Sequence, residues 1–144
     1  TGGQYSPTTP TGALATTAPY GHIERPFSAC ELALAAGASF VARSTVYHAR
    51  ELDRLIAQGI TKKGFAVIEA VSYCHTTFGR LNQAGSAVEM MRALKDNSLT
   101  VEAAAKLGEE ELRGKIVRGV LADRELPEYT AEYDKVIARA QGRA

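Results

Sequence analysis

Residues 65–71 (FAVIEAV) form the segment that most constrains how this chain can fold. The run is largely apolar and is bounded by a glycine and a serine, which is typical of a strand covered on both faces in a parallel sheet. Before it come a short strand pattern at 39–44 and an amphipathic helix pattern at 48–58, which Gly59 is expected to end. A strand, a helix and a second strand in this order predict an α/β fold with an open, mostly parallel sheet and flanking helices.

Local capping signals predict where the other helices begin and end. A serine three residues before a glutamate forms a capping box, and this pattern opens helices at Ser28 and at Ser86. The predicted helices are one from Ser28 to the C′ glycine Gly37, one opening at Ser86, a short alanine-rich one from Thr100 to about Gly108, and a last one with Pro127 at its first position. Residues 115–121 are ambiguous between helix and strand, and their β-branched side chains and internal glycine favour a strand.

Composition divides the chain into three parts. Residues 1–26 are crowded with threonine, glycine and proline and have neither strand nor helix periodicity. We therefore expect an irregular loop segment there, mobile when nothing is bound to it. Residues 27–84 carry the α/β pattern, and residues 85–144 form a C-terminal extension of helices and strand.

Charge and cysteine content argue against several classes of protein. The formal net charge of +1 gives no electrostatic footprint for nucleic acid or an anionic membrane, and no apolar run is long enough to span a bilayer. The 2 cysteines cannot form a disulfide framework, which favours a reducing, cytoplasmic setting. The 3 histidines show no metal-ligand spacing, so each is expected to be a loop or surface residue.

The opening residues Thr1, Gly2, Gly3 and Gln4 are the first candidate site. Glycines allow positive φ angles and a close approach of the backbone, while successive N–H groups and threonine hydroxyls donate to phosphate oxygens. The same four residues suit an ordinary turn, so their spacing alone leaves both interpretations open.

Cys74 is the second candidate site. It follows the 65–71 strand, and sites in open α/β sheets gather at the carboxyl ends of strands. A single cysteine there is also compatible with a buried small hydrophobic residue. Cys30 lies at the helical spacing of an apolar face and is expected to be a core thiol, whereas His75 adjoins Cys74 and could donate a hydrogen bond to a metal-bound sulfur.

The string TGGQYSPTTP at residues 1–10 resembles the second half of the cofactor-binding signature in the thiamine-diphosphate (β) subunits of 2-oxoacid:ferredoxin oxidoreductases. The resemblance continues in the family's order through residues 18–24 (APYGHIE), 36–43 (AGASFVAR), 63–65 (KGF), 72–80 (SYCHTTFGR) and 127–130 (PEYT). Among these enzymes the chain is most similar to the 2-oxoglutarate type. The first half of the signature, which carries the Asp and Asn for Mg²⁺ and diphosphate, does not precede Thr1, so we expect a partial thiamine-diphosphate-binding fold with its N-terminal half missing.

This resemblance implies that Thr1, Gly2, Gly3 and Gln4 contact thiamine diphosphate. It also implies that Cys74 is the distant fourth thiolate ligand of a [4Fe–4S] cluster whose other three ligands are not in this chain. Family members often have proline beside this cysteine, whereas Tyr73 and His75 flank it here.

The implied reaction is the coenzyme A-dependent oxidative decarboxylation of a 2-oxoacid, with electrons passing singly through the cluster to ferredoxin and with an α subunit as partner. Because half of the signature and three thiolates are missing, we expect the 144-residue chain alone to be inactive and to bind neither cofactor. The alternative is an independent, non-catalytic interaction or assembly module whose last helix docks on a partner.

Overall fold

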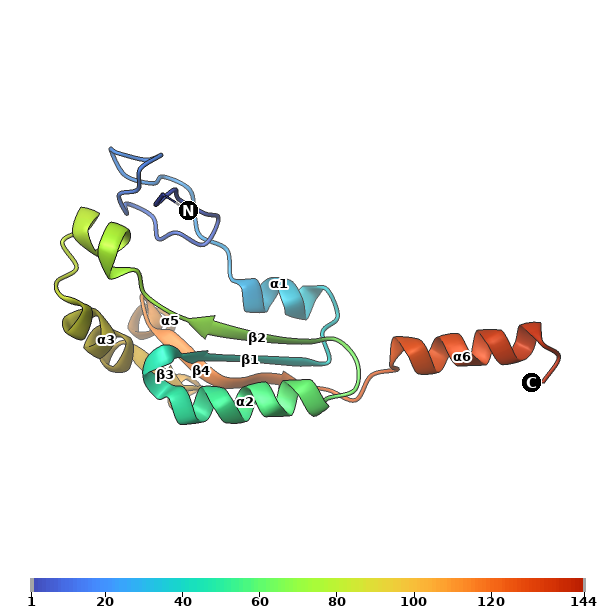
Figure 1. Ribbon diagram of the computed structural model, residues 1–144. Coiled ribbons are helices and arrows are strands. Elements are labelled where there is room, and N and C mark those ends of the chain that lie inside the picture. The colour runs from blue at the N-terminus through green and yellow to red at the C-terminus, as the bar shows by residue number, and fades with distance from the viewer. Residues whose placement is uncertain (1, 144) are drawn as a thin grey trace.

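A four-stranded sheet with helices on both faces organises the chain (Figure 1). The computed structural model describes residues 2–143. The strands are β1 (Phe40–Thr45), β2 (Ala66–Val71), β3 (Ser98–Thr100) and β4 (Ile116–Asp123), and their order across the sheet is β2-β1-β4-β3. β1 pairs with β2 and β3 with β4 in parallel, while β1 and β4 are antiparallel. The predicted α/β class with a mostly parallel sheet is therefore confirmed.

The helices are distributed over the two faces and the two ends of this sheet (Figure 1). They are α1 (Ala29–Ala35), α2 (Ala49–Thr61), α3 (Ala87–Asp96), α4 (Val101–Ala104), α5 (Glu109–Leu112) and α6 (Tyr129–Ala140), with a 3₁₀ turn η1 (Val46–His48) and a π-helical turn η2 (His75–Gly79). α1 covers one face of β1 and β2, and α2 covers the other, so the sheet is the middle layer of three.

The core lies on β1 rather than on the 65–71 segment. Val41 packs with Cys30 under α1, whereas Phe40 and Ala42 pack with Leu55 of α2, and all five are almost fully buried. β2 is only half-buried, and Ala70 is exposed. Both faces of β2 are covered, as predicted, with Val67 packed on the α1 side and Ile68 on the α2 side. Its burial is only partial because β2 lies at the edge of the sheet, where no strand between Gly2 and Arg143 pairs with its outer side.

Most helix starts follow the predicted capping residues. The Ser28 hydroxyl accepts from the N–H of Glu31 at 3.3 Å, and Ser86 and Glu89 form the complete capping box. Thr100 accepts from Ala103 N–H at 3.2 Å, although the short helix it caps ends at Ala104, earlier than expected. The ambiguous segment 115–121 is a strand, as its β-branched residues favoured.

Two helix boundaries differ from the sequence prediction. α2 does not stop at Gly59 but continues to Thr61, because this glycine faces the sheet: a Cβ atom there would lie 2.2 Å from Cδ1 of Ile68. Pro127 is not the first residue of α6, because Glu128 caps that helix with its carboxylate, which accepts from the N–H groups of Thr130 and Ala131 at 3.0 Å.

α6 extends away from the sheet at the end opposite α3 (Figure 1). Its apolar stripe, formed by Tyr129, Tyr133, Val136 and Ile137, is exposed. The rings of Tyr129 and Tyr133 stack on each other with centroids 6.0 Å apart. No helix within residues 2–143 is both long and apolar enough to cross a membrane.

Candidate functional site

The opening segment lies beside η2, at the carboxyl end of β2 (Figure 1). From Gly2 to Phe27 it consists of turns and one isolated bridge between Ala15 and Ala18, so the predicted irregular structure is confirmed. Of the four residues predicted to contact a diphosphate, Thr1 lies outside the described residues, and Gln4 is exposed with its side chain folded toward Gly2.

Gly3 brings the opening segment against the turn that follows Cys74. Both Gly2 and Gly3 have positive φ angles, +81° and +79°, which side-chain-bearing residues rarely adopt. A Cβ atom on Gly3 would lie 2.2 Å from Cγ2 of Thr77. The opening segment therefore lies directly against the turn that follows Cys74.

Backbone hydrogen bonds hold this segment in shape. Thr16 N–H donates to the Gly3 carbonyl at 2.9 Å, and Tyr5 N–H donates to the Thr17 hydroxyl at 3.2 Å. His22 is a loop residue, as predicted, but it is only 3 % exposed, and its ring is tilted against that of Tyr5 with the ring centroids 4.6 Å apart. Within the described chain its Nε2 atom has no hydrogen-bond partner.

Asn82 connects the opening segment to the polypeptide after η2. Its Oδ1 accepts from Leu14 N–H at 2.7 Å, and its Nδ2 donates to the Leu14 carbonyl at 2.9 Å and to the Phe78 carbonyl at 3.0 Å. The sequence pattern did not single out this residue, because an isolated asparagine in a loop carries no signal for a partner 68 positions away.

Cys74 lies three residues beyond the end of β2 and immediately before η2. It is exposed, so the interpretation as a buried hydrophobic residue is wrong. The Thr76 hydroxyl, 3.4 Å from the sulfur, and the N–H groups of Phe78 and Thr77 lower the pKa of the Cys74 thiol to about 7. His75 is exposed and its ring lies 6.2 Å from that of Tyr73.

Cys74 lines a cavity of about 720 Å³ at the carboxyl end of β2. Its walls come from the opening segment, from the end of β2 and from α3, and include Thr8, Thr9, Glu69, Cys74, Met90 and Leu94. The cavity is thus bounded by Cys74 and by a later part of the opening segment, with apolar side chains on the α3 side and a carboxylate on the β2 side.

A polar cluster around Glu69 forms part of that wall. Arg43 Nε donates to Glu69 Oε2 at 2.6 Å, and the Cys30 thiol donates to the same oxygen at 3.1 Å. Burial and the hydrogen bond to Glu69 raise the pKa of Cys30 to about 12. The prediction of a core thiol is confirmed, whereas the carboxylate beside it was not predicted.

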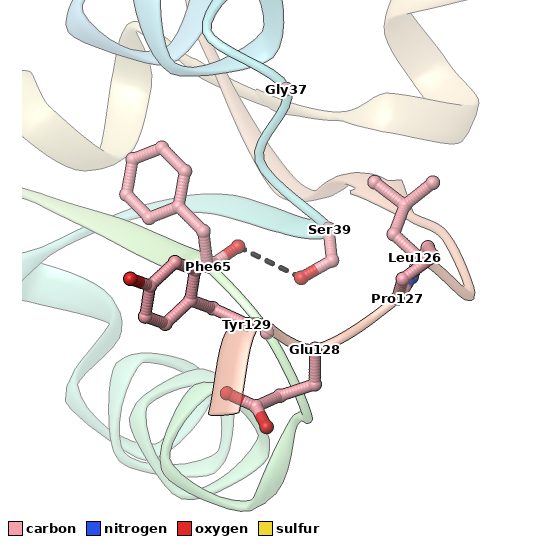
Figure 2. Close-up of a pocket in the computed structure, with 8 residues that line it drawn as sticks. Gly37, Ser39, Phe65, Leu126, Pro127, Glu128 and Tyr129 are labelled. Carbon is pink, nitrogen blue, oxygen red and sulfur yellow. Dashed lines mark hydrogen bonds between the residues drawn. The ribbon is translucent and has the colours of Figure 1, made fainter. Parts of the chain in front are cut away.

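A second hollow lies at the other end of the strands, where β1 and β2 begin. Figure 2 shows Phe65, Tyr129 and Leu126 around it, with the Ser39 hydroxyl donating to the Phe65 carbonyl at 2.9 Å. Its volume is about 530 Å³. It is separated from Cys74 by the length of β2, so it does not belong to the same site.

The residues at the carboxyl edge fit part of a cofactor site. Two successive glycines with positive φ are typical of loops that bind phosphate, and an exposed thiol with a lowered pKa is a competent metal ligand. From Gly2 to Arg143 no group of three or more His, Cys, Asp or Glu side chains is close enough to hold a metal ion. Cys74 can therefore contribute one ligand to a metal site but not the whole set.

Comparison with protein families assigns a class to this architecture. Residues 1–70 match the family described as thiamine pyrophosphate enzyme, C-terminal TPP binding domain. The matched region contains the opening segment, α1, β1, α2 and most of β2, which is the three-layer unit described above.

Individual relatives narrow the class. The chain is 51% identical over 139 residues to 2-oxoglutarate synthase subunit KorB of Methanocaldococcus jannaschii, which covers 96% of this chain and 52% of the relative. It is 47% identical over 144 residues to the same subunit of Methanothermobacter thermautotrophicus, covering 100% of this chain and 50% of the relative. The solved 2-oxoglutarate:ferredoxin oxidoreductase from Magnetococcus marinus superposes with a TM-score of 0.76 at 25% identity, over 96% of this chain and 47% of that chain.

The chain belongs to the thiamine-diphosphate-binding β subunits of the 2-oxoacid:ferredoxin oxidoreductases, and its relatives are mostly of the 2-oxoglutarate type. It spans about half the length of the curated relatives it matches. The family resemblance found in the sequence is confirmed.

Proposed function

We propose that this chain forms part of a β subunit that catalyses the coenzyme A-dependent oxidative decarboxylation of a 2-oxoacid, 2-oxoglutarate in particular, with reduction of ferredoxin. The observation that carries the proposal is the contact between Gly3 and Thr77. It supports the proposal because it brings the glycine-containing opening segment against the turn that follows the exposed Cys74 thiol. An enzyme that passes electrons from an organic cofactor to a metal cluster needs both sites near each other.

In this proposal the opening residues Thr1, Gly2, Gly3 and Gln4 hold the diphosphate of thiamine diphosphate, together with Mg²⁺. The support for this role is that both glycines have the positive φ angles found in anion-binding loops. Thiamine diphosphate supplies the stabilisation of the carbanion when it is bound, and the protein supplies position and electrostatics.

Cys74 acts as one thiolate ligand of a [4Fe–4S] cluster, and the remaining ligands come from outside this chain. Its pKa of about 7 means that about half of the thiol is already ionised at neutral pH, so little free energy is lost in removing the proton on iron binding. Both cysteines are free thiols, which agrees with a reducing, cytoplasmic compartment.

The partner proposed for this chain is an α subunit of the same enzyme, because the relatives it matches are themselves described as subunits. The division into a loop segment (1–26), an α/β part (27–84) and a C-terminal extension (85–144) is part of the same proposal. β1 and β2 fall in the α/β part, and β3, β4 and α6 fall in the extension.

Cys74→Ser tests the ligand role in the complete subunit assembled with its partner. We expect the iron content and the visible absorption band to be lost while thiamine diphosphate still binds, because a serine oxygen is a poorer iron ligand than a thiolate. Cys30→Ser is the matched control and should retain the cluster, since Cys30 is enclosed under α1. Full iron content and normal ferredoxin reduction in Cys74→Ser would refute the assignment.

The exposed stripe on α6 favours one alternative, a non-catalytic interaction module. Intact-mass measurement of the natural product distinguishes the two. A product of roughly twice this length supports the partial subunit, and a product that begins at Thr1 supports the module.

A further inference from the structure

Asn82 makes hydrogen bonds that join two segments with separate proposed roles. Its carboxamide pairs with both the N–H and the carbonyl of Leu14, at 2.7 and 2.9 Å, as a neighbouring strand would. The same Nδ2 also donates to the Phe78 carbonyl at 3.0 Å. One side chain therefore satisfies backbone groups of the opening segment and of the turn after Cys74.

From Leu14 the connection continues to the glycines at the start of the chain. Ala15 N–H donates to the Ala18 carbonyl at 3.2 Å and Thr16 N–H to the Gly3 carbonyl at 2.9 Å. Tyr5 N–H donates to the Thr17 hydroxyl at 3.2 Å. Thr16 and Thr17, two and three residues after Leu14, thus hold Gly3 and Tyr5 through one backbone N–H and one side-chain hydroxyl.

From Phe78 the connection continues to the thiol. Gly79 N–H donates to the Cys74 carbonyl at 2.8 Å and closes the π-helical turn, and Asn82 N–H donates to the Phe78 carbonyl at 2.9 Å. Gly79 has no room for a side chain, since a Cβ atom would lie 2.6 Å from the sulfur of Met90. The turn that presents its N–H groups to Cys74 is therefore fixed on one side by α3 and on the other by Asn82.

We propose that Asn82 is a positioning residue that couples the opening segment to the Cys74 turn and holds the two cofactor-binding elements in one relative geometry. That the two elements bind cofactors rests on the proposed function. The hydrogen bonds that join them are present in this chain whether or not that function is correct. Gly3 and Thr77 provide a second contact between the same two elements, so the coupling has two points of attachment.

Asn82→Ala tests the coupling in the 144-residue chain without any cofactor. Amide exchange is measured at two positions, Leu14 in the opening segment and Gly79 in the turn after Cys74. We expect Leu14 protection to fall at least tenfold, because its N–H loses the Oδ1 acceptor. We also expect Gly79 protection to fall at least threefold, because the Phe78 carbonyl loses the Nδ2 donor that holds the turn.

The Gly79 measurement separates coupling from a local structural role. A side chain that only tethered Leu14 would change exchange in the opening segment and leave the turn unchanged. Arg80→Ala is the control, because this residue lies two positions away, is exposed and takes no part in the hydrogen bonds of the Asn82 side chain. It should leave exchange at both positions within twofold of the wild-type chain.

Gly3→Ala tests the coupling from the opening segment and decides the case if Asn82→Ala fails to fold, as judged by loss of amide protection at Val41. The added Cβ displaces Thr77 within the turn and should lower Gly79 protection in the same direction. Unchanged Gly79 exchange in whichever of the two variants is folded overturns the proposal. Because no cofactor is present, this result is independent of whether Cys74→Ser keeps its cluster in the complete subunit.

Discussion

The two cysteines occupy opposite environments in one small domain. Cys30 is 1 % exposed under α1, shares the Glu69 carboxylate with Arg43 and has its pKa raised to about 12. Cys74 is exposed beyond the end of β2, surrounded by hydroxyl and N–H donors, and has its pKa lowered to about 7.

The difference shows that position in the sheet determines the chemistry of a thiol. The α1 face removes water and places an anion beside the sulfur, and both effects favour the neutral thiol. The carboxyl edge supplies donors that favour the thiolate. The same type of side chain is therefore suited to packing at Cys30 and to metal binding at Cys74.

Alkylation should show the largest contrast between these regions. At pH 7 the pKa values of about 7 and about 12 correspond to thiolate fractions that differ by about 10⁴-fold or more. We expect iodoacetamide to modify Cys74 within minutes and to leave Cys30 unmodified until the chain unfolds. Mass mapping of the two peptides over time checks this, and comparable rates would contradict the assigned environments.

Truncation of the buried core on the α2 face of the sheet should have the next largest effect. Leu55 is 2 % exposed and packs between α2 and β1, so Leu55→Ala should lower the free energy of unfolding by about 2–5 kcal/mol. Ile60 on the same helix is 78 % exposed, and Ile60→Ala should stay within about 0.5 kcal/mol. Urea unfolding of both variants provides the comparison. Equal losses of unfolding free energy would mean that Leu55 is not part of the core.

Alkaline pH should destabilise the Cys30 region selectively. The unfolded chain loses the Cys30 proton near the ordinary pKa of 9.0, whereas the folded chain keeps it until about pH 12. The contribution of this thiol to stability is therefore complete below pH 9 and is lost as pH rises toward 12, by about 1.4 kcal/mol per pH unit at most. Cys30→Ala should lack this part of the pH dependence, and parallel curves for the two proteins would refute it.

The smallest expected effect is that of Cys30→Ser. Glu69 can accept from a serine hydroxyl as it does from the thiol, so the buried hydroxyl retains a partner. We expect a loss of about 1 kcal/mol or less in thermal or urea unfolding. A loss several times larger would mean that the sulfur itself, through its size, fills space that oxygen cannot.

Local features of this fold were predictable from the sequence. Ser28, Ser86 and Thr100 cap helices as expected, because each hydrogen bond joins residues three positions apart. The position of Cys74 beyond a strand was predictable for the same reason.

Features that depend on contacts between distant segments could not be read from the pattern. The apolar run 65–71 predicts a strand but not its place in the sheet, and β2 proved to be the edge while β1 carries the core. Glu69, Asn82 and the buried His22 owe their environments to partners from other parts of the chain. Thr1, Gly2, Gly3 and Gln4 as cofactor contacts remain predictions that rest on family resemblance.

The open edge of β2 has a consequence for how the chain behaves in solution. Its outer row of N–H and C=O groups faces no other strand within the described chain, and its one charged residue, Glu69, is engaged by Arg43. An apolar edge without protecting charges or prolines is a template for pairing between molecules. The 144-residue chain on its own should therefore self-associate as its concentration rises, through intermolecular sheet formation at β2.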